Sequence, residues 1–270
     1  MQELKHAMSH NNLLMSGLIV AKHFQADMNV ASSIAQIEDF IIRSGKHIAS
    51  ASTPQEKLNQ FVDFFYKDLA FSGDERDFFA SKYNLINQVI AFRTGIPVSM
   101  AMIFCQVGNA IGLKLSGVNF PGHFLVRCEL DEDKTVFIDP LNGTRLNWQQ
   151  LQQLYSSILG ESAEESMPVE TLDAVGVEET VIRLLHNLKS AYINEENYQD
   201  ALATVDLLVQ LCPDDPYERR DRGFLLHQLE CPTVALADYE YFIKHCPKDP
   251  STPLLKIQLK QLQQQSVILH

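Results

Sequence analysis

The sequence predicts an α+β domain followed by an all-helical repeat region. Three observations lead to this fold class. Apolar residues recur at helical spacing through the first third of the chain, short alternating stretches lie between residues 114 and 138, and the last third repeats itself after 34 residues. A chain of 270 residues has room for one large domain or two small ones.

The first part of the chain is predicted to be a helical lead-in. Residues Val30–Ile42 carry apolar side chains near the 3.6-residue period of a helix. Thr53, Pro54 and Glu56 have the pattern of a helix start, with an N-cap, a proline in the first turn and the acid of a capping box. Asn84–Phe92 predicts a further helix, which we expect to end at Thr94-Gly95-Ile96-Pro97, a terminator followed by a restart.

The middle of the chain predicts a buried helix and a small sheet. Ser99–Ile111 is too long for a strand and too apolar for an exposed helix. After it, Lys114–Val118, Phe124–Cys128 and Thr135–Ile138 have strand character, and residues 131–134 supply a polar hairpin turn. A small antiparallel sheet packed on the helix Ser99–Ile111 is an α+β arrangement.

Charge and composition exclude several classes of function. The 34 acidic residues outnumber the 22 basic ones, which gives a net charge of −12 and no basic face for nucleic acid or for an anionic membrane. The apolar run Leu13–Ala21 is far shorter than the ~20 residues of a membrane span and ends in charge rather than in a cleavage site. The five cysteines lack CxxC spacing, so we expect reduced thiols, no metal site and a cytoplasmic protein.

The acidic residues concentrate in one segment. No Lys or Arg lies between Arg145 and Arg183, whereas Glu161, Glu164 and Glu165 begin a run of acids that continues to residue 179. A charge block interrupted by Gly and Pro is typical of a solvated linker. We therefore predict a first domain at residues 1–165, an acidic linker at 166–180, and a repeat region at 181–270.

The repeat region has a period of 34 residues. Ala201 recurs as Ala235, Pro213 as Pro247, and the pair Asp215-Pro216 as Asp249-Pro250. This period, with helix-sized halves, is the tetratricopeptide signature. Position 8 of the repeat holds Gly223 in the second copy but Lys189 in the first, which departs from the pattern. We predict two repeats and a closing helix over Pro253–Gln264, with these residues packing the repeats together: Ala201, Gly223, Ala235, Pro213 and Pro247.

Three polar residues of the α+β region form a candidate catalytic group. Ser99 lies at the start of the buried helix, His123 at the start of a strand, and Asp139 at the end of the next strand. A helix N-terminus favours negative charge, an imidazole can act as a base, and a carboxylate can orient that imidazole. Each residue also has a simpler interpretation: a helix cap for Ser99, a buried structural histidine for His123, and a turn residue for Asp139.

Several stretches around these residues resemble transglutaminase-like proteins. The stretches are Tyr83–Asn87, Gly95–Ser99, Pro121–Arg127 and Phe137–Gly143. They look like a bacterial cytosolic family that joins a transglutaminase-like domain to C-terminal tetratricopeptide repeats and is named after a proposed regulator of invasion genes. The resemblance covers the chain from about residue 30 to its end, and it implies a nucleophile, a base and an orienting acid at Ser99, His123 and Asp139.

The resemblance breaks at the nucleophile. Catalytic transglutaminases have a cysteine where this chain has Ser99, and a hydroxyl is a poor nucleophile until a base removes its proton. Cys105, six residues along the same helix, is turned about 240° around the axis and cannot replace it. Beside Ser99, a group of polar residues is expected either to line a cleft or to hold local backbone. These residues are Tyr83, Asn84, Asn87 and Arg93.

The sequence leaves three functions open. The first is a non-catalytic protein or peptide binder, built on a degenerate transglutaminase-like domain with repeats for the partner. The second is an acyl-transfer or hydrolytic enzyme that uses Ser99, His123 and Asp139. The third is a regulatory adaptor, which the family's name alone suggests. We expect no cofactor, and the sequence does not specify an oligomeric state.

Overall fold

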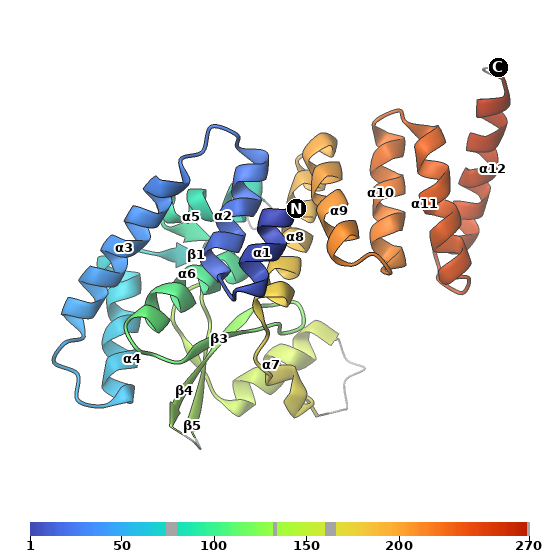
Figure 1. Cartoon of the computed structure of the whole chain (residues 1–270). Coiled ribbons are helices and arrows are strands. Elements are labelled where there is room, and N and C mark those ends of the chain that lie inside the picture. Colours follow the sequence, from blue (N-terminus) through green and yellow to red (C-terminus); the bar gives the residue numbers. More distant parts are fainter. Residues whose placement is uncertain (74–79, 132–133, 160–165, 269–270) are drawn as a thin grey trace. The chain divides into compact units, whose positions relative to one another are not determined.

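The computed structural model describes residues 1–73, 80–131, 134–159 and 166–268. The chain divides into two compact units, Gln2–Leu184 and Leu185–His270 (Figure 1). The predicted α+β fold class is confirmed, because a helical lead-in and a helix-and-sheet core precede a run of helices. The tip of the expected hairpin turn, residues 132 and 133, and the acids at 161, 164 and 165 lie outside the described residues.

The helical lead-in comprises α1 (Gln2–Ser9), α2 (Leu13–Phe24), α3 (Val30–His47), α4 (Pro54–Asp63) and a π-helical turn, η1 (Phe64–Asp68). Local side-chain caps fix where these helices start. Asn12 caps α2 and Asn29 caps α3, each by accepting a hydrogen bond from a backbone N–H in the first turn. At α4 the predicted capping box is present, since Thr53 Oγ1 accepts from Glu56 N and the Glu56 carboxylate accepts from Thr53 N.

The short helix α5 (Ile86–Phe92) ends differently from the prediction. Arg93, rather than Gly95, takes the left-handed conformation with φ 60°, and its N–H donates to the Val89 carbonyl at 2.9 Å. Gly95 lies instead in β2 (Thr94–Gly95), which pairs in parallel with β1 (Ser72–Gly73). Glycine is needed there for space, because a Cβ atom would lie 2.6 Å from Ser99 Oγ.

Helix α6 (Pro97–Ala110) is the centre of the core, as predicted for Ser99–Ile111. Every residue from Pro97 to Cys105 is buried. Aromatic rings from the lead-in pack against Phe104, with Phe61 at 4.7 Å and Phe65 at 5.0 Å between ring centroids. The start of the helix therefore has no face left for solvent.

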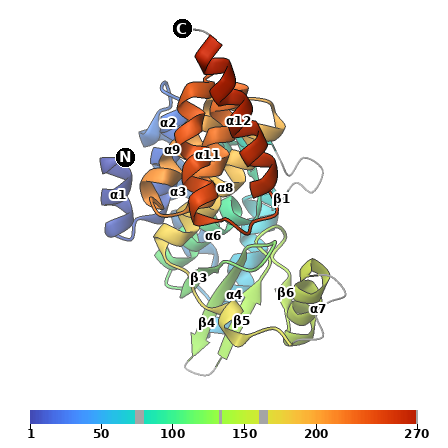
Figure 2. The same cartoon turned by 90° about the vertical axis from the view of Figure 1, so that its right-hand side faces the viewer.

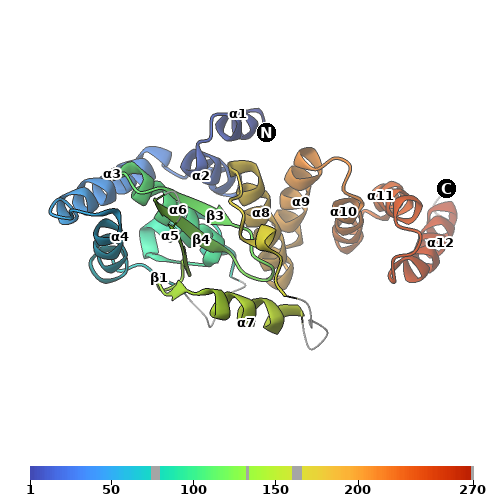
Figure 3. The ribbon, with the colours of Figure 1, turned by 90° about the horizontal axis from the view of Figure 1, so that it is seen from below.

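The sheet is antiparallel with the strand order β3-β4-β5-β6, and the predicted strands are present. Its strands are β3 (Leu115–Val118), β4 (Leu125–Asp131), β5 (Lys134–Ile138) and β6 (Arg145–Leu146). Val126 and Ile138 are register partners that join the core around α6. Leu125 and Phe137 belong to a second core on the other face, which α7 (Trp148–Leu159) covers (Figure 3). Helix α7 and strand β6 are elements that we did not predict.

The segment 166–180 differs from the solvated linker that we expected. Met167 and Leu172 are buried in the second core, and the stretch contains a 3₁₀ turn, η3 (Val169–Leu172). Val175 N donates to the Gly117 carbonyl of β3 at 2.9 Å. Leu115, on the same strand, is hydrogen-bonded to the side chain of Asn109 of α6. The Asn109 amide donates to the Leu115 carbonyl and accepts from the Leu115 N–H. The apolar residues among the acids thus hold this segment against the sheet.

The repeat helices are α8 (Val177–Asn194), α9 (Tyr198–Leu211), α10 (Pro216–Gln228), α11 (Pro232–His245) and α12 (Thr252–Ile268). From residue 185 on they form the second unit, with α10, α11 and α12 in sequence (Figure 1). Ala201 and Ala235 are fully buried, and Gly223 contacts Tyr239, as the 34-residue register predicts. Pro213 and Pro247 are exposed, so they follow the ends of α9 and α11 and do not pack the repeats.

Among the described residues, none of the helices combines the length and the apolar character that a bilayer crossing requires. The longest helices, α3 and α8, each have 18 residues and include charged side chains.

The capping box at α4 gives a test of the local energetics. Thr53→Ala removes the acceptor for Glu56 N and is expected to lower the free energy of unfolding by about 1 kcal/mol. Thr53→Ser keeps the hydroxyl and should cost much less. Urea denaturation followed by circular dichroism measures both variants, and equal values for the two would contradict the capping role.

Candidate functional site

His123 and Asp139 meet at the end of the sheet where β4 begins and β5 ends. Gly122, with φ 63°, turns the chain just before His123, and Asp139 directly follows Ile138, the register partner of Val126. His123 Nε2 lies 3.1 Å from Asp139 Oδ2. Both side chains are mostly buried, so the predicted hydrogen bond is present and shielded from solvent.

The Asp139 carboxylate accepts two hydrogen bonds, one at each oxygen. Its Oδ2 accepts from the imidazole, and its Oδ1 accepts from Leu141 N at 2.9 Å, which fixes the turn after β5. Because a carboxylate only accepts, His123 Nε2 donates, and Nδ1 is then the basic nitrogen of the neutral ring. Within the described residues, Nδ1 has no hydrogen-bond partner. This ring is oriented as a base would be.

Ser99 is not part of this pair. It lies in the first turn of α6, where its hydroxyl accepts from Ile96 N at 3.1 Å and donates to the Tyr83 carbonyl at 2.6 Å. The side chain is fully buried. Across the described part of the chain, no hydrogen bond joins Ser99 to His123. The structure therefore brings together the expected base and orienting acid, and it uses the expected nucleophile to satisfy backbone groups.

The four residues expected beside Ser99 do not gather around one cleft. Tyr83 lines a hollow of about 240 Å³ together with Phe92 and Thr94. Asn84 is buried, and the Asn87 amide donates to Gln25 Oε1 at 2.6 Å. The Arg93 guanidinium stacks on the Phe40 ring, 4.1 Å from its centroid, and burial lowers the pKa of Arg93. Of the four, Tyr83 alone borders that hollow.

The cysteines of this unit are core residues. Cys105 and Cys128 are both buried. Burial raises the pKa of Cys105 to about 12 and that of Cys128 to about 11. Neither side chain carries a thiolate near neutral pH, so neither replaces the missing nucleophile of the transglutaminase pattern.

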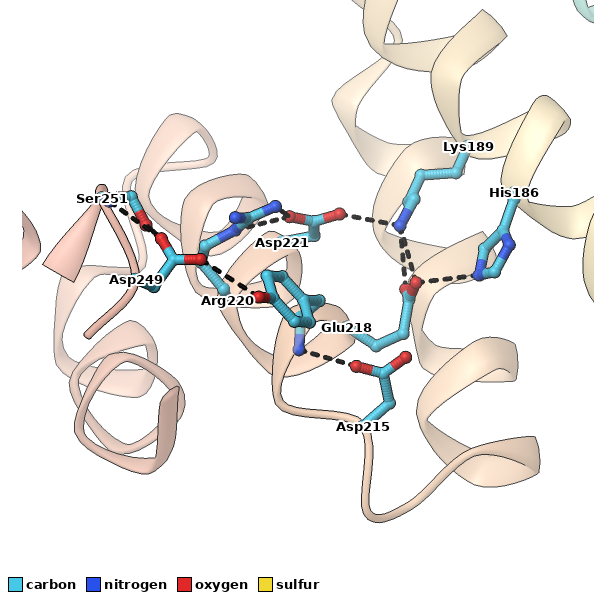
Figure 4. Close-up of polar contacts among 9 residues, drawn as sticks. His186, Lys189, Asp215, Glu218, Arg220, Asp221, Asp249 and Ser251 are labelled. Carbon is cyan, nitrogen blue, oxygen red and sulfur yellow. Dashed lines mark hydrogen bonds and ion pairs between the residues drawn. The ribbon is translucent and has the colours of Figure 1, made fainter. Parts of the chain in front are cut away.

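The repeat unit contains a buried ionic cluster that sequence reasoning missed. Lys189, the residue that breaks the repeat pattern, lies against α10 (Figure 4). Its ammonium donates to Glu218 Oε1 at 2.8 Å and to Asp221 Oδ2 at 2.7 Å. His186 Nε2 lies 3.0 Å from Glu218 Oε1. The only signal in the sequence was the mismatch at position 8, since the partners lie 29 and 32 residues away.

The cluster favours the charged forms of Lys189 and Glu218. Burial would lower the pKa of Lys189, but the nearby carboxylates of Asp221 and Glu218 outweigh burial and raise it. Burial would likewise raise the pKa of Glu218, yet hydrogen bonds from His186 and Lys189 hold it below its ordinary value of 4.5. The cluster links α8 to α10 and fixes how these two helices meet.

Comparison with known proteins places this architecture in a class. The chain matches the family model described as transglutaminase-like superfamily over residues 31–186, and the tetratricopeptide repeat model over residues 188–260. The fold and these matches define a transglutaminase-like domain followed by tetratricopeptide repeats, as the resemblance implied. None of the solved structures matches the chain.

Within this class, the chain belongs to the UPF0162 family of bacterial proteins. A UPF0162 protein of Vibrio cholerae serotype O1 is 38% identical over 215 residues, 79% of each chain. UPF0162 protein YchA of Escherichia coli strain K12 is 30% identical over 258 residues, 95% of each chain. Protein SirB1 of Salmonella typhimurium is 29% identical over 262 residues, 97% of each chain.

Removing the Asp139 carboxylate tests the His123 pair. Asp139→Ala leaves His123 Nε2–H and Leu141 N–H without their acceptor, and it should lower the free energy of unfolding by about 1–3 kcal/mol. The exposed carboxylate Asp173 gives a matched control, because Asp173→Ala should be nearly neutral. Chemical denaturation measures both, and an unchanged midpoint for Asp139→Ala would contradict a buried pair.

Removing the Lys189 ammonium tests the ionic cluster. Lys189→Met takes a buried cation from the Glu218 and Asp221 carboxylates, which keep His186 and Arg220 as partners, and should cost about 3 kcal/mol at pH 7. The pKa of Glu218 is lowered in the folded chain, so its contribution in the unchanged protein is present above pH 4.5 and is lost as the pH falls. The cost of Lys189→Met should therefore shrink between pH 7 and pH 4. Denaturation at the two pH values measures it, and an equal cost at both would argue against the cluster.

Proposed function

We propose that this protein is a non-catalytic binding protein of the cytoplasm, with a regulatory role. In this proposal the transglutaminase-like domain is a scaffold and the repeats bind a protein or peptide partner. The observation that carries the proposal is the state of Ser99, whose buried hydroxyl is hydrogen-bonded to backbone on both sides. The negative net charge of −12 supports a protein partner over nucleic acid.

The chemistry of Ser99 argues against acyl transfer. A serine attacks a carbonyl only when an aligned base takes its proton and an oxyanion hole receives the charge. Here the hydroxyl donates to the Tyr83 carbonyl, which takes up no proton. Attack would also require breaking the hydrogen bond that Ile96 N–H donates to Ser99 Oγ. This hydrogen bond satisfies a backbone group at the start of α6, where water has no access. The site is thus stabilised in a form that does not react.

The second candidate function is an acyl-transfer or hydrolytic enzyme that uses Ser99, His123 and Asp139. One observation favours it: the hydrogen bond between His123 and Asp139 has the geometry of a base and its orienting acid. A rearrangement of the first turn of α6 would have to free Ser99 and bring it to His123 Nδ1. The two functions make opposite predictions for the reactivity of residue 99.

Labelling with a fluorophosphonate probe separates the two functions. We expect no labelling of the folded protein that depends on Ser99, because the hydroxyl is buried and its proton is committed to the Tyr83 carbonyl. The unchanged chain and Ser99→Ala are compared by intact mass after exposure to the probe. Labelling that disappears in Ser99→Ala, or ester turnover that does, would overturn the binding proposal in favour of a hydrolase.

A thiol introduced at position 99 measures the electrostatics of the same site. In Ser99→Cys we expect the new thiol to react with iodoacetamide as slowly as the buried Cys105, whereas the exposed Cys231 reacts fast and serves as an internal standard. Peptide mapping over time gives the three rates. If the thiol of the Ser99→Cys variant reacts as fast as Cys231, or faster, the site is accessible and has catalytic character.

A further inference from the structure

In the second repeat, one face of α10 is paired with α11 by charge and by shape. The Arg222 guanidinium donates to both oxygens of Asp238 on α11, each at 2.7 Å, and Arg219 donates to the same carboxylate at 3.3 Å. Asp238 is buried. Beside it, Gly223 faces Tyr239, and a Cβ atom at Gly223 would lie 2.8 Å from that ring. The buried carboxylate of Asp238 and the ring of Tyr239 therefore fix how α11 packs against α10.

The same face of α12 has no partner within the described residues. Adding the 34-residue period to Arg222, Gly223 and Leu226 gives Lys256, Ile257 and Lys260. All three are exposed, Ile257 by 57%, and neighbouring Leu254 is exposed by 68%. In the described structure neither lysine forms an ion pair.

The opposite face of α12 is the one that packs against α11 (Figure 2). Leu255, Leu259 and Leu262 join a core with Tyr239 and Phe242 of α11. Helix α12 thus has the place of the first helix of a third repeat, and no second helix packs on it within the described residues. An exposed apolar centre flanked by two lysines is an unusual surface for a solvated helix face, which normally is polar throughout.

We propose that the face of α12 formed by Leu254, Lys256, Ile257 and Lys260 binds an acidic amphipathic helix of another protein. That helix packs on α12 as α11 packs on α10, with a carboxylate beside Lys256, which stands in the place of Arg222, and with Lys260 one turn further along α12. This inference rests on the proposed function, and it names the surface and the partner chemistry. A second copy of α12 is disfavoured as the occupant, since it would bring the same lysines together.

The partner helix must also differ from α11 in one respect. Ile257 stands where the second repeat has glycine, so a tyrosine opposite it would clash as a Cβ atom at Gly223 would. The side chain that follows the acid must therefore be small. The proposed partner segment is a helix with an acid followed by alanine, glycine or serine at the centre of its apolar face.

A peptide made from this chain's own α11 provides the probe. The peptide covers residues 231–246 with Tyr239→Ala, carries a fluorophore, and is held helical by a lactam between Glu240 and Lys244, which are exposed and four residues apart. Circular dichroism verifies its helicity. Fluorescence anisotropy with the full-length protein then measures its affinity, which we expect on the order of 10–100 µM for one short helix.

Substitutions on both sides define the expected result. Ile257→Asp should weaken binding at least tenfold, and Lys256→Glu about three- to tenfold, whereas the matched charge change Lys248→Glu, on the loop before α12, should leave it unchanged. A peptide with Asp238→Lys should bind the unchanged protein more weakly. Its affinity should be restored when the protein carries Lys256→Glu. The peptide that keeps Tyr239 should bind at least fivefold more weakly than its alanine counterpart.

Three outcomes would overturn this inference. One is the absence of binding by a peptide of verified helicity, and another is binding that Ile257→Asp does not weaken. The third is a dimer, seen by sedimentation, that Ile257→Asp dissociates, because a second copy would then occupy the face. Reactivity at Ser99 would overturn the proposed function and leave this binding measurement standing, so the two failures are distinguishable.

Discussion

The fold of the first unit depends on one constraint, the complete burial of the start of α6. A helix that begins inside a core must satisfy its first N–H groups without water, and the residues around it must supply the acceptors. Ser99 Oγ accepts from Ile96 N and donates its own proton to the Tyr83 carbonyl. Gly95 leaves the space for that hydroxyl, and the stretch before α5 positions that carbonyl. The same burial that makes α6 the centre of the core encloses the Ser99 hydroxyl, away from solvent.

The repeat unit contains a charged side chain at a position where the repeat pattern has a small residue. Lys189 stands in a position that holds glycine in the second repeat, and its long side chain reaches α10 instead of leaving room for a neighbour. The carboxylates of Glu218 and Asp221 compensate the charge, and His186 lies against the Glu218 carboxylate. Ionic groups of this kind contribute more to a specific arrangement of helices than to net stability, because their desolvation offsets much of their attraction.

Much of the fold could be predicted because its signals are local. The capping box at Thr53, the apolar run of α6 and the alternation of β4 each lie within a few residues, and the repeat shows as a fixed period. The His123–Asp139 bond could be anticipated too, since a hairpin joins the strands that carry the two residues. What could not be predicted depends on distant partners. The bond from Ser99 reaches Tyr83, the cluster at Lys189 joins two helices, and Met167 and Leu172 hold an acidic segment in a core that α7 completes.

The contacts that Asn109 and Val175 make with the edge strand β3 affect the tendency of the protein to aggregate at high concentration. An open edge strand invites pairing with the edge of another molecule, and this is a common route to aggregation. Here the Asn109 amide occupies both polar groups of Leu115, and Val175 occupies the carbonyl of Gly117. At the other end of the sheet, β6 is two residues long. Both edges therefore offer too few free backbone groups for strand addition, and a nascent chain gains this protection only when the segment around Val175 has been synthesised and docked.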